Sequence, residues 1–239
     1  MRILYAEFAA WLHQDARAWD RAQHWTDRAL TWSHQLDDNY SIAATLIRKA
    51  QIANDQGDGK EAYELAKAAE RAAPPGTRFV AVAAAFTGHG YALAGERAAS
   101  ERAFDRARAL ADDADADPSW GFFLDHPYID VHQAHGRVAL GDYRGAIEQF
   151  GAAISGMRSG FTRDQAVYVA RQAVACAKAG DAEPAAQLGQ AAMRVGVSTG
   201  SERILHNIHE LNDLLDPHSK QSEVVAFRDA GQRWAVLTS

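Results

Sequence analysis

The stretch LGDYRGAIEQF (Leu140 to Phe150) joins a glycine turn to an alanine and a phenylalanine at helical spacing. Similar turns occur at Gly57, Gly95 and Gly180, and Arg17 takes the equivalent place near the amino terminus. The spacings between the five successive positions are 40, 38, 46 and 39 residues. A period in this range is typical of stacked supersecondary units, so we interpret the chain as a helical repeat array.

Small residues recur in a fixed register around these five anchors. Two antiparallel helices joined by a tight turn approach closely only where their side chains are small, and a turn glycine can adopt the left-handed conformation that ends a helix. The pattern therefore predicts an all-α fold, a right-handed α-solenoid of five helical hairpins followed by capping helices. The small residues seven before, five after and twelve after the anchors are Ala10, Ala50, Gly88, Ala134 and Ala173, then Ala22, Ala62, Ser100, Ala146 and Ala185, then Ala29, Ala69, Ala107, Ala153 and Ala192.

The hairpins are expected to form a single domain over residues 1–239. The apolar residues between Ile204 and Leu215 form a helical stripe that Pro217 ends, and a last helix follows, which is typical of a terminal cap. The predicted hairpins cover residues 3–35, 40–74, 78–112, 125–158 and 163–198, and the cap covers residues 201–237.

Composition narrows the function classes. Apolar residues make up 47% of the chain and charged residues 23%, as in ordinary globular proteins. The formal charge of −6 and the absence of a Lys/Arg cluster argue against direct contact with nucleic acid. The single Cys176 excludes an intramolecular disulfide and fits a reducing compartment. No apolar run has the length of a membrane span, so a cytoplasmic protein without membrane contact is expected.

Two segments, GHGYALAGERAASERAFDRA (88–107) and LGDYRGAIEQFGAAI (140–154), resemble the tetratricopeptide repeat. The resemblance implies stacked helical hairpins. This chain departs from the repeat pattern in lacking the usual tryptophan of the first helix, and its units are several residues longer.

Three longer segments resemble the carboxy-terminal sensor region of actinobacterial Xre-type helix-turn-helix regulators. They cover residues 6–35, 115–150 and 200–215. In such regulators a small DNA-binding module precedes the array, whereas Met1 lies just ahead of the first predicted helix here. The chain is therefore interpreted either as part of a longer regulator or as a free-standing array, and no DNA binding is assigned to its residues.

The first helix of each hairpin is expected to line a concave side, where extended peptides or small effectors bind. Gln51 and Asn54 share a helix face, and their amides would clamp a peptide backbone. Arg48 or Arg171 would hold a carboxylate. The alternative is a solvated face with scattered polar groups. The predicted ligand-binding residues are Trp11, Gln14, Arg48, Gln51, Asn54, His89, His132, His135 and Arg171.

The favoured function is a sensor domain of a transcriptional regulator that binds a peptide or small-molecule effector. The bound effector would shift the conformational equilibrium of a homodimer or of an attached DNA-binding module. The alternative is a free-standing scaffold that binds a partner protein without a regulatory ligand. No catalytic constellation is found, so no enzyme activity and no cofactor are expected. The pairs His132/His135 and His206/His209 lack the further ligands that zinc requires.

Aromatic residues gather at two other places. Residues 117–128 contain Trp120, Phe122, Phe123 and Tyr128, which would either cover the ligand site as a plug or extend the core, and the core is preferred. Trp19, Trp25 and Trp32 recur around the second helix of the first hairpin. They are expected to pack within the array, and any exposed ones would form a dimer seam.

Overall fold

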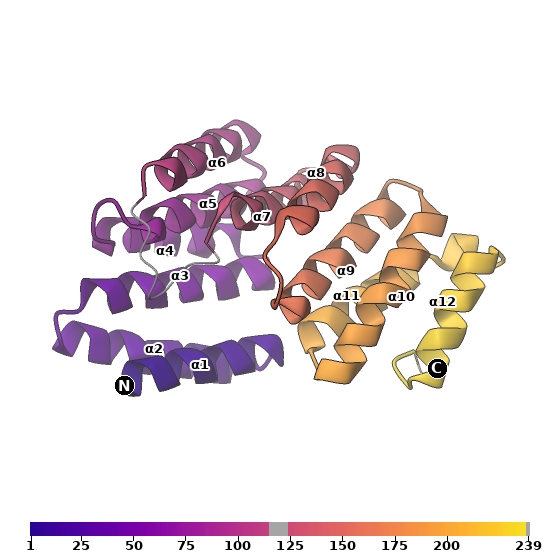
Figure 1. The fold of residues 1–239 in the computed structure, drawn as a ribbon, viewed down its shortest axis with the longest axis horizontal. Helices are drawn as coiled ribbons and strands as arrows, with labels where there is room; N and C mark the ends of the chain where they lie inside the picture. The colour runs from indigo at the N-terminus through magenta and orange to yellow at the C-terminus, as the bar shows by residue number, and fades with distance from the viewer. Residues whose placement is uncertain (115–123, 238–239) are drawn as a thin grey trace. The chain divides into compact units, whose positions relative to one another are not determined.

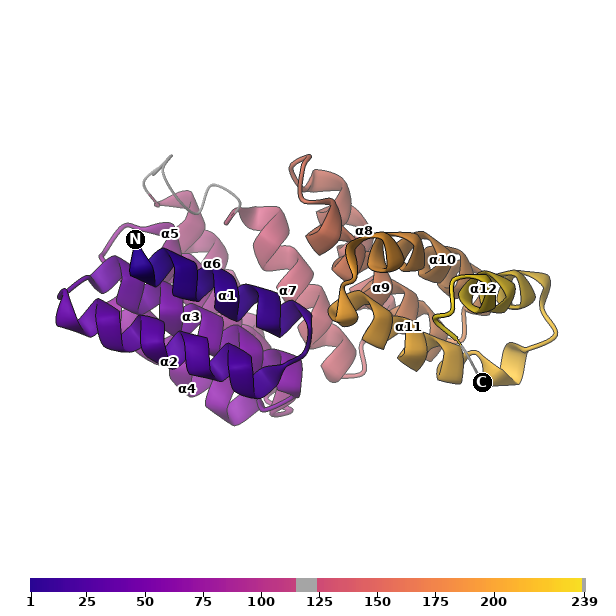
Figure 2. The same cartoon turned by 90° about the horizontal axis from the view of Figure 1, so that it is seen from below.

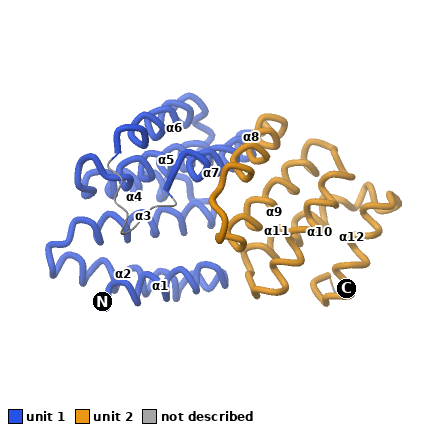
Figure 3. Tube along the Cα trace, viewed as in Figure 1, with its two compact units in different colours: residues 1–140 blue, residues 141–239 orange. Residues whose placement is uncertain are grey.

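The structure is a computed structural model that describes residues 1–114 and 124–237. These residues fold into helices and connecting turns, and no strand occurs among them. The chain divides into two compact units, residues 1–140 (unit 1) and residues 141–239 (unit 2), coloured separately in Figure 3. The prediction of an all-α chain is confirmed for the described residues.

Unit 1 is built from consecutive helices that pack as pairs (Figure 1). Helix α1 packs on α2, α3 on α4 and α5 on α6, and α7 contacts both α5 and α6. The bounds are α1 (Arg2–Asp15), α2 (Trp19–Gln35), α3 (Asn39–Gln56), α4 (Gly59–Ala72), α5 (Arg78–Leu93), α6 (Arg97–Asp112) and α7 (His126–Ala139).

In unit 2, α9 pairs with α10, α8 and α11 pack on α9, and α12 packs on α10. The expected capping segment forms α11, a short 3₁₀ turn and α12. Residues of the predicted fourth hairpin form α7 in unit 1 and α8 in unit 2. The bounds are α8 (Tyr143–Gly156), α9 (Thr162–Lys178), α10 (Ala182–Thr199), α11 (Glu202–Leu214), η1 (Asp216–His218) and α12 (Ser222–Arg233).

The repeated turns have the left-handed geometry that the sequence predicts. The φ angles of Gly57, Gly95, Gly141 and Gly180 are 81°, 80°, 78° and 87°. Arg17 adopts the same region with φ 52°, although a side chain makes this conformation unfavourable. Each of these residues separates two helices, so the five anchors mark real helix ends.

The predicted small residues lie at the helix contacts. All fifteen are buried, and among the alanines Ala153 has the largest exposure at only 4%. A Cβ atom added at Gly88 would come within 2.8 Å of the Phe104 ring, so α5 reaches α6 only because this position lacks a side chain. Close approach at small residues is therefore the packing rule of both units.

Two glycines let the backbones of α4 and α5 approach each other closely. A Cβ atom at Gly59 would lie 2.5 Å from the backbone oxygen of Gly90, and a Cβ atom at Gly90 would lie 2.7 Å from the backbone nitrogen of Tyr63. Backbone atoms cannot move aside as a flexible side chain can. Glycine is therefore required on both sides of this contact.

The first helices of the pairs form one layer of unit 1. Helix α3 contacts α1 and α5, and α5 contacts α7, whereas no comparable contact joins α2 to α4 or α4 to α6 among the described residues. Figure 2 shows α1, α2 and α3 side by side from below. Because the first helices contact one another in sequence whereas the second helices do not, the first helices form one side of unit 1, which we call its inner side, and the second helices form the other, outer side.

The structure shows where some of the aromatic residues noted in the sequence lie. Trp120, Phe122 and Phe123 lie outside the described residues. Tyr128 is half-buried and packs against a core cluster that contains Phe79 and Phe86. Trp25 and Trp32 pack against the cluster of Ile3, Ala6 and Ala29, while Trp19 lies under the guanidinium of Arg17.

Within residues 1–114 and 124–237, none of the helices combines the length and the apolar character that crossing a bilayer requires.

We expect Gly90→Ala to lower the free energy of unfolding by about 1–3 kcal/mol, because the new methyl group would collide with the backbone of α4. Chemical denaturation measures this difference. Gly151→Ala is the matched control: its Cβ atom would lie 3.4 Å from Gln172 Nε2, so the change should be neutral or slightly stabilising. Equal stability of the wild type and Gly90→Ala would contradict the contact.

Candidate functional site

A chain of side-chain hydrogen bonds links α1 to α3 on the inner side of unit 1. Gln14 Nε2 donates to Asp55 Oδ2 at 2.7 Å, and Gln14 Oε1 accepts from Arg48 Nη1 at 3.1 Å. Gln14 is completely buried. One amide therefore uses both its donor and its acceptor to connect the two helices.

Arg48 is the centre of this cluster. Its Nη1 also donates to Gln51 Oε1 at 2.6 Å, and its Nε lies 3.8 Å from Glu7 Oε2 in an ion pair. Side-chain exposure is 23% for Arg48 and 18% for Glu7, so solvent screens the pair only partly. We call Glu7, Gln14, Arg48, Gln51 and Asp55 the α1–α3 polar network.

Three polar groups in or beside the α1–α3 polar network have no hydrogen-bond partner among the described residues, and one of them is Arg48 Nε, whose 3.8 Å contact with Glu7 is an ion pair only. Asn54, adjacent to Asp55, is only 3% exposed, and neither its amide nitrogen nor its amide oxygen is paired. Glu7 Oε1 is also buried and unpaired. Nearly all buried polar side chains in folded proteins are paired, so these groups require an explanation.

A second cluster lies between α5 and α7. The His89 ring centroid is 4.6 Å from that of His135 and 6.0 Å from that of His132. His132 also contacts Phe86 at 4.6 Å and Tyr128 at 4.8 Å. His89 and His132 are buried, so these imidazoles lie within an aromatic packing layer.

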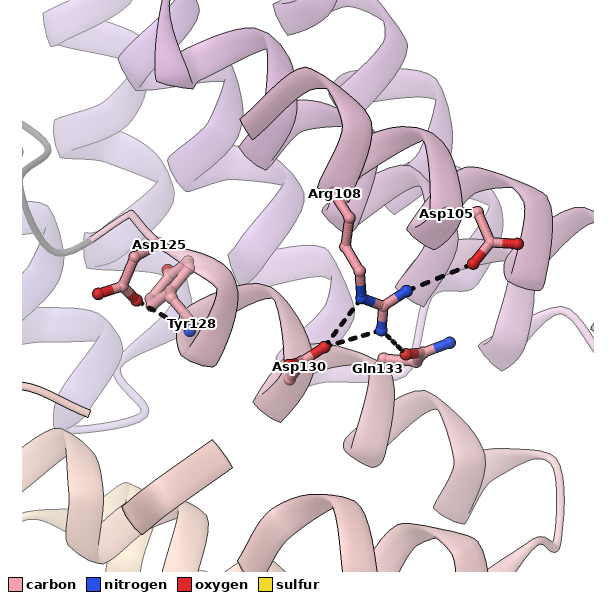
Figure 4. A network of polar contacts seen from close by, with 6 residues as sticks. All are labelled: Asp105, Arg108, Asp125, Tyr128, Asp130 and Gln133. Atoms are coloured by element: carbon pink, nitrogen blue, oxygen red, sulfur yellow. Dashed lines mark hydrogen bonds and ion pairs between the residues drawn. The ribbon is translucent and has the colours of Figure 1, made fainter. Parts of the chain in front are cut away.

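Arg108 fixes the position of α7 that brings these histidines to α5. From α6, its Nε and Nη2 both donate to Asp130 Oδ1, at 3.1 and 2.7 Å, and Nη2 also donates to Gln133 (Figure 4). Asp125 accepts from the Tyr128 backbone N–H at 3.3 Å and caps the start of α7. Asp130 and Gln133 thus face α6 while the histidines face α5.

The structure brings the predicted ligand residues together in two groups. Gln14, Arg48 and Gln51 are directly hydrogen-bonded, and His89, His132 and His135 are in ring contact. Trp11 stacks on Phe8 at a centroid distance of 5.8 Å. Arg171 is buried in α9 of unit 2, away from both groups along the chain.

Sequence reasoning missed Glu7 and Asp55. Glu7 lies one turn before Trp11 and two turns before Gln14, so the helical periodicity that selected those residues would also have found it. Asp55 directly follows Asn54, but its bond to Gln14 joins residues 41 positions apart, which no local pattern contains. Arg48 was expected to hold a ligand carboxylate, and such an anion would have to compete with Glu7.

A pocket of about 490 Å³ lies elsewhere in unit 1, between α2, α3 and α4. Its wall on α3 is formed by Lys49, Ile52, Ala53 and Gln56, a different stripe of the helix from Arg48, Gln51 and Asp55. None of the predicted ligand residues lines it. The pocket and the α1–α3 polar network are therefore separate features.

The described residues contain no metal-binding cluster, and the thiol of the single cysteine is not activated. Among the described residues, no group of three or more His, Cys, Asp or Glu side chains is arranged to hold a metal ion. His206 and His209 are exposed on α11. Cys176 is 2% exposed, and desolvation, followed by the nearby Asp181 charge, raises the pKa of its thiol to about 11. The thiol is therefore protonated at neutral pH.

No protein-family model matches the sequence, and no curated protein matches it.

We expect the Cys176 thiol to react very slowly with Ellman's reagent at pH 8 in the native protein, because only the thiolate attacks and burial suppresses it. Denaturation in guanidinium chloride should restore rapid reaction. Leu36→Cys supplies the control, since Leu36 is 59% exposed and a thiol there should react at once. Rapid reaction of the native wild-type protein would contradict the buried position.

Proposed function

We propose that unit 1 is a ligand-binding domain that holds an extended peptide segment against α1 and α3, at the α1–α3 polar network and Asn54. In the wider proposal, which rests on the sequence resemblance, this domain is the sensor part of a cytoplasmic bacterial transcriptional regulator. The observation that carries the binding proposal is the buried Asn54 amide, whose donor and acceptor are both unpaired.

An unpaired buried amide is unfavourable for folding. Leaving a buried donor or acceptor unsatisfied costs about 1–3 kcal/mol. A side chain that reduces stability in this way is common where binding depends on it, because function and stability are often in conflict. A peptide group offers one N–H and one C=O, which are the two partners that an Asn side chain can receive.

The charge of the network favours a basic ligand. Glu7 and Asp55 supply two carboxylates and Arg48 one guanidinium, and the unpaired Glu7 Oε1 is an acceptor only. A lysine or arginine side chain would pair with this oxygen in a charge-assisted hydrogen bond. An acidic ligand would instead meet two carboxylates of its own sign.

Binding at this place would act on the packing of α1 against α3. A ligand shifts a conformational equilibrium only by the difference in its affinity for the two states. Because the Asn54 amide atoms and Glu7 Oε1 are buried in the free protein, a ligand pairs with them only in an arrangement of α1 and α3 that uncovers these atoms, and binding would stabilise that arrangement. Through this stabilisation, effector binding would influence an attached DNA-binding module.

The unpaired amide gives a test that needs no ligand. We expect Asn54→Leu, which keeps the side-chain size and removes the polar atoms, to raise the free energy of unfolding by about 1–2 kcal/mol. Gln14→Leu is the matched control, since it removes two hydrogen bonds and should lower stability. If Asn54→Leu proves destabilising, the amide has a partner in the free protein and the argument for binding is lost.

Selection of random displayed peptides on the immobilised chain tests the binding itself. The wild type should enrich peptides that contain Lys or Arg, Asn54→Leu should lose that enrichment, and Glu7→Gln should lose the preference for basic residues. Denaturation curves confirm beforehand that each variant is folded. Recovery of the same peptides from the wild type and from Asn54→Leu would exclude this site, and enrichment of acidic peptides would overturn the assignment of ligand charge.

A further inference from the structure

Helix α1 carries large apolar side chains on its solvent side. Leu4, Tyr5, Phe8 and Leu12 are 65%, 67%, 58% and 42% exposed. The opposite side of α1 is buried through Ile3, Ala6 and Ala10, so the exposed stripe is not needed for packing within unit 1. We call Leu4, Tyr5, Phe8, Trp11 and Leu12 the α1 stripe.

The neighbouring helix α2 shows no such apolar exposure. Every exposed residue of α2 is polar or charged, whereas Arg2 is the one charged residue among the exposed residues of α1. A soluble protein rarely leaves a continuous apolar surface of this kind open, and such surfaces mark interaction sites. The α1 stripe is therefore expected to be covered by a partner.

The order of residues in the stripe identifies that partner. Leu4 and Leu12 lie four residues before and after Phe8, and Tyr5 and Trp11 lie three before and after it. In an antiparallel pair of identical helices with a two-fold axis at Phe8, Leu4 meets the Leu12 of the other copy and Tyr5 meets its Trp11. A two-fold interface requires a self-complementary surface, and this stripe satisfies that condition.

The area of the stripe agrees with this pairing, and the one exposed charge of α1, Arg2, lies to the side of the stripe, where it donates to Gln35 Oε1 at 3.3 Å and lies over the Trp32 ring of α2. Two copies of the stripe would bury on the order of 1,000 Å² in total, near the lower limit for a specific interface. We propose that two copies of this chain dimerise through antiparallel contact of their α1 stripes, centred on Phe8, in a concentration-dependent equilibrium.

Sedimentation velocity over a range of protein concentrations tests the dimer. The wild type should shift from monomer at low micromolar to dimer at high micromolar concentration, and Phe8→Glu should be monomeric throughout. Leu36→Glu is the control, because Leu36 is as exposed as Phe8 but lies beyond the end of α2, and it should dimerise like the wild type. Circular dichroism confirms that each variant is folded.

Cysteine cross-linking tests the register. Phe8→Cys should form a covalent dimer with a short bismaleimide, whereas Leu4→Cys and Leu12→Cys should do so only when the two variants are mixed. Cys176 is buried and does not interfere. A wild type that stays monomeric at every concentration, or a dimer that survives Phe8→Glu, would overturn the proposal.

Discussion

Helices in this protein pack closely only because small residues stand where they cross. The Gly59–Gly90 contact is the extreme case, since each glycine faces the backbone of the other helix at a distance that no Cβ atom tolerates. The alanines at the other crossings also allow the helices to approach closely, but the space there still accommodates a methyl group. Larger side chains such as Phe104 then fill the space that the close approach leaves between neighbouring pairs.

This dependence explains why the fold is accessible from the sequence. The positions of the small residues around Gly57, Gly95, Gly141 and Gly180 indicate where the helices end and where the two helices of a pair cross. Both features depend on residues that are close together in the sequence. Arg17 could be placed as the fifth turn only from its position in the register, and it adopts the left-handed conformation despite its side chain. Gly59 and Gly90 escaped notice because their contact joins two different repeats.

The candidate site was less predictable, for a physical reason. Helical spacing indicates which side chains share a face, and it placed Gln51 and Asn54, three residues apart, on one helix, which is α3 in the structure. It does not indicate pairing. The bonds from Gln14 to Asp55 and Arg48 link helices, and the absence of a partner at Asn54 is decided by everything packed around it. Similarly, the sequence shows that α1 is rich in apolar residues, but it does not indicate which of them the rest of unit 1 leaves exposed to solvent.

The strained turn at Arg17 makes the first hairpin different from the others. A left-handed conformation costs a residue with a side chain roughly 1 kcal/mol, whereas the four turn glycines adopt it freely. The hairpin of α1 and α2 therefore starts with less intrinsic stability. Because α1 bears both Glu7 and Gln14 on one side and Phe8 on another, a small hinge movement at Arg17 would displace both surfaces at once.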